Sequence, residues 1–161
     1  MQAADENLKK NILAADAVGF SKLVSENEYE TLASLKDCLK IFAELISKNG
    51  GRIFHSAGDS VLAEFVDSKN ALKAARSIQS EICEHQKSTK LQKLEFRMGI
   101  DFGEVFADGD NLLGEAVNFA VRLESFAQPN GISLSKRFYQ NLGMSELLSL
   151  NSFQPQRKLF I

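Results

Sequence analysis

The chain has 161 residues, of which 44% are hydrophobic and 25% are charged, and its formal net charge is −2. This length and composition are typical of a single globular domain that buries its own core. A net charge so close to zero gives no electrostatic basis for binding nucleic acid or an anionic membrane, so we expect neither as a partner.

The cysteines and the apolar runs indicate where such a chain would reside. Cys38 and Cys83 lie in helical patterns without metal-ligand spacing, which favours reduced thiols. The longest apolar runs are shorter than the roughly 20 residues of a membrane-spanning helix, and residues 1–6 lack a signal-peptide layout. We therefore expect a cytoplasmic protein, with residues 1–161 forming one domain and no membrane segment in this chain.

The first run of interest begins at Asn11 and ends at Asp16. It is apolar, short enough for a buried strand, and followed by Gly19 and a polar stretch before a long helical pattern. Where a strand feeds a glycine turn and a helix start, backbone N–H groups point outward, ready for phosphate oxygens. A single acidic residue at a strand end is more often a turn former, so a metal site here requires a second carboxylate.

Asp59 is the second carboxylate. It lies in a four-residue connection, 57–60, between strands that we expect over 52–56 and 61–65. If the first strand lies beside this hairpin, Asp16 and Asp59 converge at one edge of the sheet. Such a pair suits Mg²⁺ or Mn²⁺, which share the rest of their ligands with substrate phosphates. Spacing alone leaves two ordinary turn aspartates as an equal alternative.

Two helices flank the hairpin in the sequence. Ser25 and Glu28 have the spacing of a capping box, which predicts a helix that ends at the glycines 50 and 51. Its apolar stripe, predicted to be core, comprises Tyr29, Leu32, Leu35, Leu39, Phe42, Leu45 and Ile46. A second helix is predicted to open at Asp67 and Ser68.

The order of elements then predicts the fold class. Residues 94–102 are predicted to form a strand, 103–107 another strand after a glycine bend, and 108–110 a turn. The order strand, helix, strand, strand, helix, strand predicts an α+β protein of ferredoxin-like plan, with helices on one side of a mainly antiparallel sheet.

The remaining segments are shorter. We predict a third helix over 114–127, a short strand over 132–134 and a short helix over 136–142. Residues 157–161 have the pattern of a strand whose pairing is incomplete, which suggests a missing C-terminal segment.

Asn118 and Arg122 lie four residues apart on the polar face of the third helix. Such a pair is commonly a solvated surface pair. Alternatively, the guanidinium supplies permanent positive charge to a phosphate while the amide orients a hydroxyl or a sugar. The spacing alone does not decide between the two.

Five stretches carry a family resemblance. They are Leu13 to Ser21, Gly50 to Ile53, Gly58-Asp59, Phe96 to Ile100 and Gly114 to Glu124. In this order they closely resemble the catalytic domain of class III nucleotide cyclases, in the bacterial adenylate cyclase group, over about residues 11–142. The resemblance implies the class III cyclase fold, a ferredoxin-like βαββαβ core with an additional C-terminal helix and strand. It also implies a homodimer with active sites in the interface.

The implied reaction is that of a phosphorus–oxygen lyase, which converts ATP, or alternatively GTP, to a 3′,5′-cyclic nucleotide and pyrophosphate. By resemblance, Asp16, Ala17 and Asp59 would bind two Mg²⁺ or Mn²⁺ ions. One ion would lower the pKa of the ribose 3′-hydroxyl for attack on the α-phosphorus, and the other would hold the triphosphate.

The substrate contacts follow from the same resemblance. Asn118 would position the ribose, and Arg122 would stabilise charge on the transferring phosphoryl group. Phosphate oxygens would bind the backbone N–H groups of Ala17, Val18, Gly19, Phe20 and Ser21.

Two positions depart from the family's pattern, and both concern the base. His55 stands where adenylate cyclases generally have lysine, and their usual aspartate falls on Asn111, unless a one-residue insertion gives that place to Asp110. The glutamate and cysteine typical of guanylate cyclases are absent too. A histidine can donate or accept a hydrogen bond, so it discriminates between purines poorly. The equal alternative is that His55 is an exposed strand residue that contacts no ligand.

The departures leave a second hypothesis open: a catalytically silent, cyclase-like domain that binds nucleotide or regulates another chain. A palm-type polymerase or diguanylate cyclase shares the fold plan, but no Gly-Gly-Asp-Glu-Phe-like signature is present. For the cyclase, we expect a regulatory or sensor domain, or a partner chain, to control it.

Overall fold

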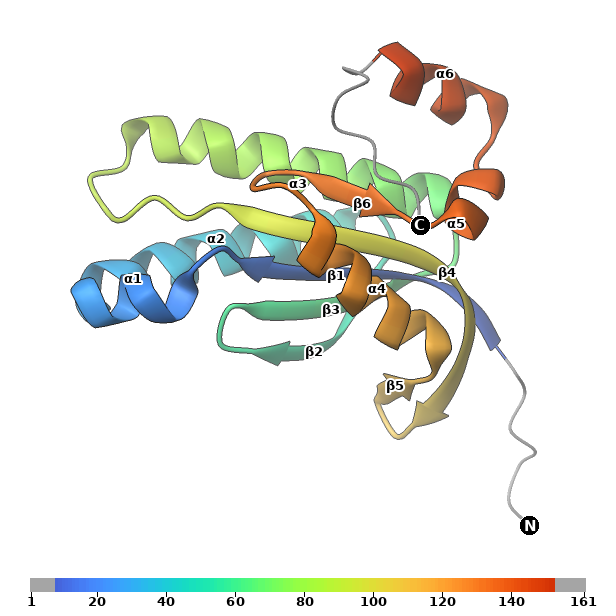
Figure 1. The fold of residues 1–161 in the computed structure, drawn as a ribbon, viewed down its shortest axis with the longest axis horizontal. Coiled ribbons are helices and arrows are strands. Elements are labelled where there is room, and N and C mark those ends of the chain that lie inside the picture. The colour runs from blue at the N-terminus through green and yellow to red at the C-terminus, as the bar shows by residue number, and fades with distance from the viewer. Residues whose placement is uncertain (1–7, 153–161) are drawn as a thin grey trace.

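The computed structural model describes residues 8–152, so the strand expected over 157–161 lies outside the described residues. The elements are β1 (Leu8–Ala17), α1 (Phe20–Glu26), α2 (Glu28–Lys48), β2 (Arg52–Ala57), β3 (Ser60–Phe65), α3 (Ser68–Ser88), β4 (Phe96–Asp108), β5 (Asn111–Leu113), α4 (Glu115–Phe126), β6 (Ile132–Leu134), α5 (Lys136–Gln140) and α6 (Met144–Ser152) (Figure 1). Within this part of the chain, no helix is long and apolar enough to cross a membrane.

The strands form one mixed sheet in the order β2-β3-β1-β4-β5. β1 lies between β3 and β4 and is antiparallel to both, while β6 pairs with β4 in parallel. The four strands of the βαββαβ unit thus have the ferredoxin-like arrangement, with β1 and β4 at its centre. The predicted α+β, ferredoxin-like plan is confirmed.

Side chains of β1 alternate between two cores. Leu13 and Ala15 face a large core formed with α2 and α3, whereas Ile12 and Ala14 face a smaller core formed with α4. Figure 1 shows α2 and α3 behind the sheet and α4 crossing its front. The prediction that α2 and α3 share one side is confirmed, and α4 covers the opposite face.

The predicted capping box is wrong. Asn27, not Ser25, caps α2, because its side chain accepts the N–H of Glu30. The Ser25 hydroxyl instead donates to the carbonyl of Lys22 in α1. Two cap-forming residues two positions apart compete here, and the backbone of Asn27 has the extended conformation that a cap requires.

The predicted stripe of α2 is only partly core. Leu35, Phe42 and Ile46 are buried, but Tyr29 and Leu32 near the start of the helix are exposed. The end of the helix is as predicted, with Gly50 in the left-handed region at φ 73°.

Three predictions for strands and turns need correction. The hairpin turn is two residues long, Gly58 and Asp59, because Ala57 and Ser60 already pair. The strands predicted on either side of a bend at Gly103 are a single strand, β4, because Gly103 keeps its pairing with Lys10 of β1. The sequence analysis did not predict β5 or α6.

Gly99 of β4 allows α4 to lie very close to the sheet. A Cβ at this position would stand 2.3 Å from the carbonyl oxygen of Ala120 and 2.4 Å from the backbone nitrogen of Glu124. Only a glycine permits this approach. The contact brings Glu124 down onto the strands that carry the candidate site.

Candidate active site

Asp16 and Arg97 form an ion pair at the end of the two central strands. They are partners in the β1–β4 register, and the Nε and Nη2 atoms of Arg97 lie 3.2 Å and 3.1 Å from the two carboxylate oxygens of Asp16. Nη1 of the same guanidinium donates to the carbonyl of Ser125 at 3.3 Å. The pair is partly exposed, so Asp16 is accessible from solvent.

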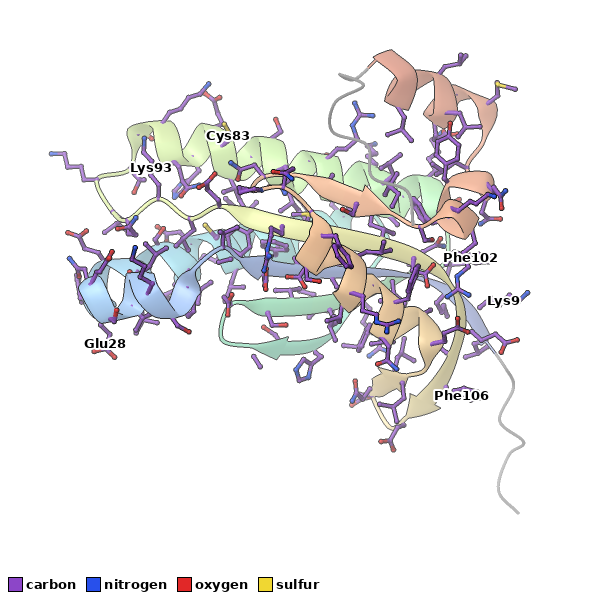
Figure 2. The ribbon with its side chains drawn as sticks, viewed as in Figure 1. Lys9, Glu28, Cys83, Lys93, Phe102 and Phe106 are labelled. Atoms are coloured by element: carbon purple, nitrogen blue, oxygen red, sulfur yellow. The ribbon has the colours of Figure 1, made fainter. Side chains whose placement is uncertain are left out.

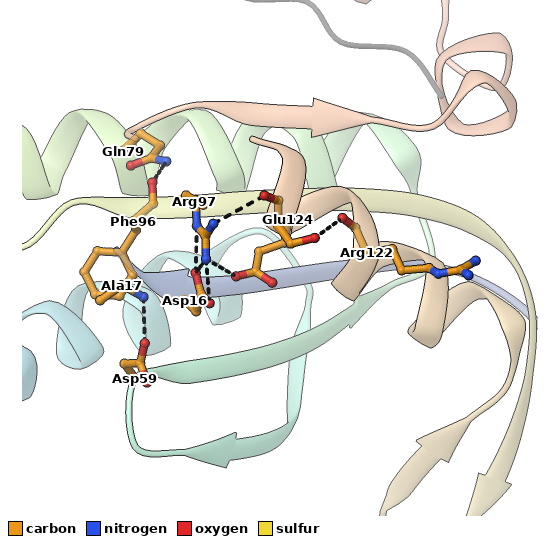
Figure 3. A network of polar contacts seen from close by, with 9 residues as sticks. Asp16, Ala17, Asp59, Gln79, Phe96, Arg97, Arg122 and Glu124 are labelled. Atoms are coloured by element: carbon orange, nitrogen blue, oxygen red, sulfur yellow. Dashed lines mark hydrogen bonds and ion pairs between the residues drawn. The ribbon is translucent and has the colours of Figure 1, made fainter. Parts of the chain in front are cut away.

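Asp59 lies beside this pair. Its Oδ2 accepts the backbone N–H of Ala17 at 2.9 Å, across 42 residues of sequence (Figure 3). Because Ala17 follows Asp16 directly, this hydrogen bond fixes the β2–β3 turn next to the end of β1. The contact agrees with the expectation that Asp16 and Asp59 lie close together, here at the ends of central strands.

Glu124 completes a cluster of three carboxyl groups. It extends from α4 and is 5% exposed, and its Oε1 atom has no hydrogen-bond partner in the described residues. The nearest cation is Arg97, whose Nη2 lies 3.9 Å from that oxygen. Burial, and then the neighbouring Asp16, raise the pKa of Glu124 to about 8, although the charge of Arg97 opposes this rise.

The donor set fits a magnesium or manganese ion in part. Two carboxylates and nearby backbone carbonyls are hard oxygen ligands of the kind these ions take. No group of three or more acidic, histidine or cysteine side chains within the described residues is arranged to hold a metal ion. The two aspartates therefore suit an ion that takes its remaining ligands from a phosphate. Arg97 would have to release an oxygen of Asp16 for the ion to bind there.

The backbone amides after β1 are less free than the resemblance implied. The N–H of Ala17 donates to Asp59, and the N–H of Val18 donates to the carbonyl of Glu95 at 2.7 Å. The amides of Gly19, Phe20 and Ser21 are left at the start of α1, where a helix offers no internal acceptor. Gly19 has a positive φ of 62°, the turn that lets the chain enter this helix.

Asn118 and Arg122 lie on the exposed face of α4. Figure 3 shows the Arg122 side chain extending away from Asp16 and Asp59. The fold therefore does not bring this pair onto the carboxylates of its own chain.

The candidate base-recognition residues lie on β2 and around the β4–β5 turn, at the two ends of the strand order. His55 is exposed on β2, opposite Leu62 of β3. Asp110 is exposed in the β4–β5 turn, and Asn111 follows it at the start of β5. The side-chain oxygen of Asn111 accepts the N–H of Leu112 at 2.9 Å.

Sequence reasoning assigned no role to Arg97 or Glu124. Both lie inside stretches that carry the family resemblance, and that was the available signal. Their roles depend on a pairing across 81 residues and on the close approach at Gly99, neither of which local sequence encodes.

Comparison with known proteins supports the assignment of the fold. The chain matches a family model described as the adenylate and guanylate cyclase catalytic domain over residues 5–156. It is 31% identical over 142 residues to a putative adenylate cyclase 3 of Rhizobium meliloti (strain 1021), covering 85% of this chain and 24% of that protein. It is 32% identical over 142 residues to an adenylate cyclase of Streptomyces coelicolor, covering 86% of this chain and 36% of that protein. The chain thus spans well under half the length of these curated relatives.

Solved structures show the same likeness. An adenylate/guanylate cyclase/hydrolase from Silicibacter pomeroyi is 31% identical, with a TM-score of 0.76 and coverage of 84% of this chain and 80% of that one. The guanylyl cyclase Cya2 is 27% identical, with a TM-score of 0.78 and coverage of 88% and 81%. The chain belongs to the adenylate and guanylate cyclase catalytic domain family.

Proposed function

We propose that this cyclase domain converts a purine nucleoside triphosphate, ATP in preference to GTP, to its 3′,5′-cyclic monophosphate and pyrophosphate. The observation that carries the proposal is the hydrogen bond from the Ala17 amide to Asp59, which places the Asp59 carboxylate next to the residue that follows Asp16. The preference for ATP rests on the curated relatives, which are named as adenylate cyclases.

Asp16 and Asp59 act by holding divalent cations, two Mg²⁺ or Mn²⁺ ions, with the Ala17 carbonyl as a further oxygen ligand. Ions held there would lower the pKa of the ribose 3′-hydroxyl and would neutralise triphosphate charge. The 3′-oxygen forms a bond to the α-phosphorus, the bond from that phosphorus to the bridging oxygen of pyrophosphate breaks, and the hydroxyl proton passes to water. With a cation on Asp16, Arg97 would still have Glu124 as a neighbouring carboxyl group, 3.9 Å away.

The proposal requires a second copy of the chain. Asn118 and Arg122 are exposed on α4, and Arg122 extends away from Asp16. In a homodimer, the asparagine and arginine of one subunit face the aspartates of the other. Val121 and Phe126, which are 43% and 59% exposed beside this pair, provide apolar surface for such a contact.

The domain boundaries and the control of activity are also part of the proposal. We take residues 11–142 as the core of one catalytic domain, in line with the match over residues 5–156. The curated relatives are much longer than this chain, which supports regulation by a sensor domain or a partner.

The direct test is product formation. Purified protein is incubated with Mn²⁺ and either ATP or GTP, and the products are separated by chromatography. We expect cyclic nucleotide from the parent and from the control Asp37→Ala, whose carboxylate lies on α2, but not from Asp16→Ala. Nucleotide binding by calorimetry without any cyclic product would contradict the proposal and favour the silent, nucleotide-binding alternative.

Mixing two inactive variants tests the shared site. Asp16→Ala and Arg122→Ala damage opposite halves of each site, so a mixed dimer keeps one intact site of two. We expect an equimolar mixture to recover about a quarter of the parent activity, because half of the dimers are mixed. No recovery, or sedimentation as a monomer at every concentration, would contradict the homodimer.

A further inference from the structure

A bulge in β2 places Arg52 and His55 on the same face of the sheet. The pairing with β3 shifts between Ile53 and His55, so that Arg52 lies opposite Glu64 and His55 opposite Leu62. Glu64 and Leu62 are two residues apart and therefore share a face. Without the extra residue, Arg52 and His55, three positions apart, would point to opposite faces.

Arg52 also reaches the opposite edge of the sheet. Its Nη1 atom donates to the carbonyl oxygen of Asp110 at 2.6 Å, and its Nε lies 3.3 Å from Oε1 of Glu64. β2 and β5 end the strand order on opposite sides, but the curvature of β4 brings β5 into contact with β2 (Figure 1). The Arg52 guanidinium thus connects β2, which carries His55, to the turn that contains Asp110.

The hydrogen bond between Arg52 and Asp110 affects the positions of the candidate base-recognition residues. Adenine and guanine present opposite donors and acceptors at positions 1 and 6, so a protein distinguishes them by groups held at hydrogen-bonding distance from both positions. The β4–β5 turn is exposed, and Gly109 within it has a positive φ of 60°. The charged hydrogen bond from Arg52 helps to hold this turn against β2.

We infer that Arg52 is a positioning residue for purine selection, because it fixes the separation between His55 and the turn residues Asp110 and Asn111. The inference rests on the proposed function, since it concerns the choice between ATP and GTP. It assigns Arg52 no contact with the reacting atoms. Loss of the Arg52 contact should therefore change the choice of nucleotide more than the rate of the chemical step.

The test compares Arg52→Gln with the parent in the full chain. We measure kcat and KM for ATP and for GTP, and expect the ratio of the two kcat/KM values to change by about threefold or more, the effect of losing one hydrogen bond. Arg52→Lys, which keeps the charge and one donor, should retain part of the selectivity. The matched charge control is Lys93→Gln, in the α3–β4 connection away from β2 (Figure 2), and it should leave the ratio unchanged.

A second variant separates the two contacts of Arg52. Glu64→Gln removes the ion pair but keeps the hydrogen bond to Asp110, and we expect the parent ratio. Hydrogen exchange of the amides at 109–112 should accelerate in Arg52→Gln and not in Glu64→Gln.

Two results would overturn the inference while the proposed function stands. One is an active Arg52→Gln variant whose ratio lies within about 1.5-fold of the parent, and the other is an equal effect of Glu64→Gln and Arg52→Gln. If the parent converts neither nucleotide, the proposed function itself fails and the inference fails with it.

Discussion

Two aspartate–arginine pairs lie along β4, and they differ in what surrounds them. Asp101 of β4 is fully buried, and both of its oxygens accept from Arg137 of α5. Asp16 is paired with Arg97 of β4 but is 30% exposed. It also has a buried carboxyl neighbour, Glu124, with an unpartnered oxygen.

The comparison separates an ion pair that supports the fold from one that suits a ligand. At Asp101 the guanidinium satisfies the buried carboxylate completely, so nothing further needs to bind. At Asp16, the pair is partly exposed and Asp59 lies beside it, so a cation from solvent can reach the carboxylates. Both places have the same aspartate–arginine pair. The neighbouring groups determine whether the pair supports the fold or can bind a ligand.

The largest expected difference is in activity. Asp16→Asn should reduce cyclase activity by about a hundredfold or more, because a metal ligand is lost. It should change the free energy of unfolding by less than about 1 kcal/mol, since the pair is partly exposed. Product formation and urea unfolding measure the two effects. Asp101→Asn should instead lower the free energy of unfolding and leave the activity per folded molecule unchanged. A loss of that activity would contradict the comparison.

Removing the arginine of the buried pair should affect stability. Arg137→Gln leaves the Asp101 carboxylate buried without a cation, and we expect a loss of about 3 kcal/mol in the free energy of unfolding. Arg97→Gln, the matched change at the other pair, should cost about 1 kcal/mol or less. Equal losses in urea unfolding would show that both pairs are structural.

The raised pKa of Glu124 predicts that stability at the Asp16 cluster depends on pH. The pKa of about 8 lies above the ordinary value of 4.5, so the folded state favours the protonated acid. The resulting stability is fully present below pH 4.5 and is lost as pH rises through 8. Glu124→Gln mimics the neutral acid at every pH. The variant should therefore lie within about 1 kcal/mol of the parent near pH 5 and exceed its free energy of unfolding by about 4 kcal/mol at pH 9. A constant difference between pH 5 and 9 would contradict this.

Gly99, which lies between the two pairs on β4, gives the smallest expected effect. Gly99→Ala would force the added methyl group against the backbone of α4 and should cost about 1 to 2 kcal/mol. Because α4 carries Glu124 and not Asp101, activity should fall in addition to stability. Unchanged activity per folded molecule would show that the position of α4 does not control the Asp16 cluster.

Much of the fold could be predicted because periodicity and turn residues are local. β1, the hairpin and the long helices follow from such patterns, and the convergence of Asp16 and Asp59 follows from the strand order. The sequence could not show that Gly103 continues the strand, because its pairing with Lys10 is a tertiary contact. It also could not show that Tyr29 is exposed, since an apolar stripe specifies a helix face and not how far the neighbouring core extends.

The site was predicted less completely, for a related reason. Motifs identify the residues that a family shares, but the role of Glu124 arises from its burial and that of Arg97 from its partners. Similarly, the contact of Arg52 with Asp110 joins residues 58 apart and depends on the curvature of the sheet.

The continuity of β4 makes the molecule sensitive to deletions. Successive residues of a strand point to opposite faces, so the loss of a single residue such as Phe102 would invert every side chain that follows it in the strand. Arg97 would keep its place beside Asp16, whereas Val105 would leave the small core under α4. Natural variation in length should therefore be confined to the turn after Asp108 and be excluded from the strand itself.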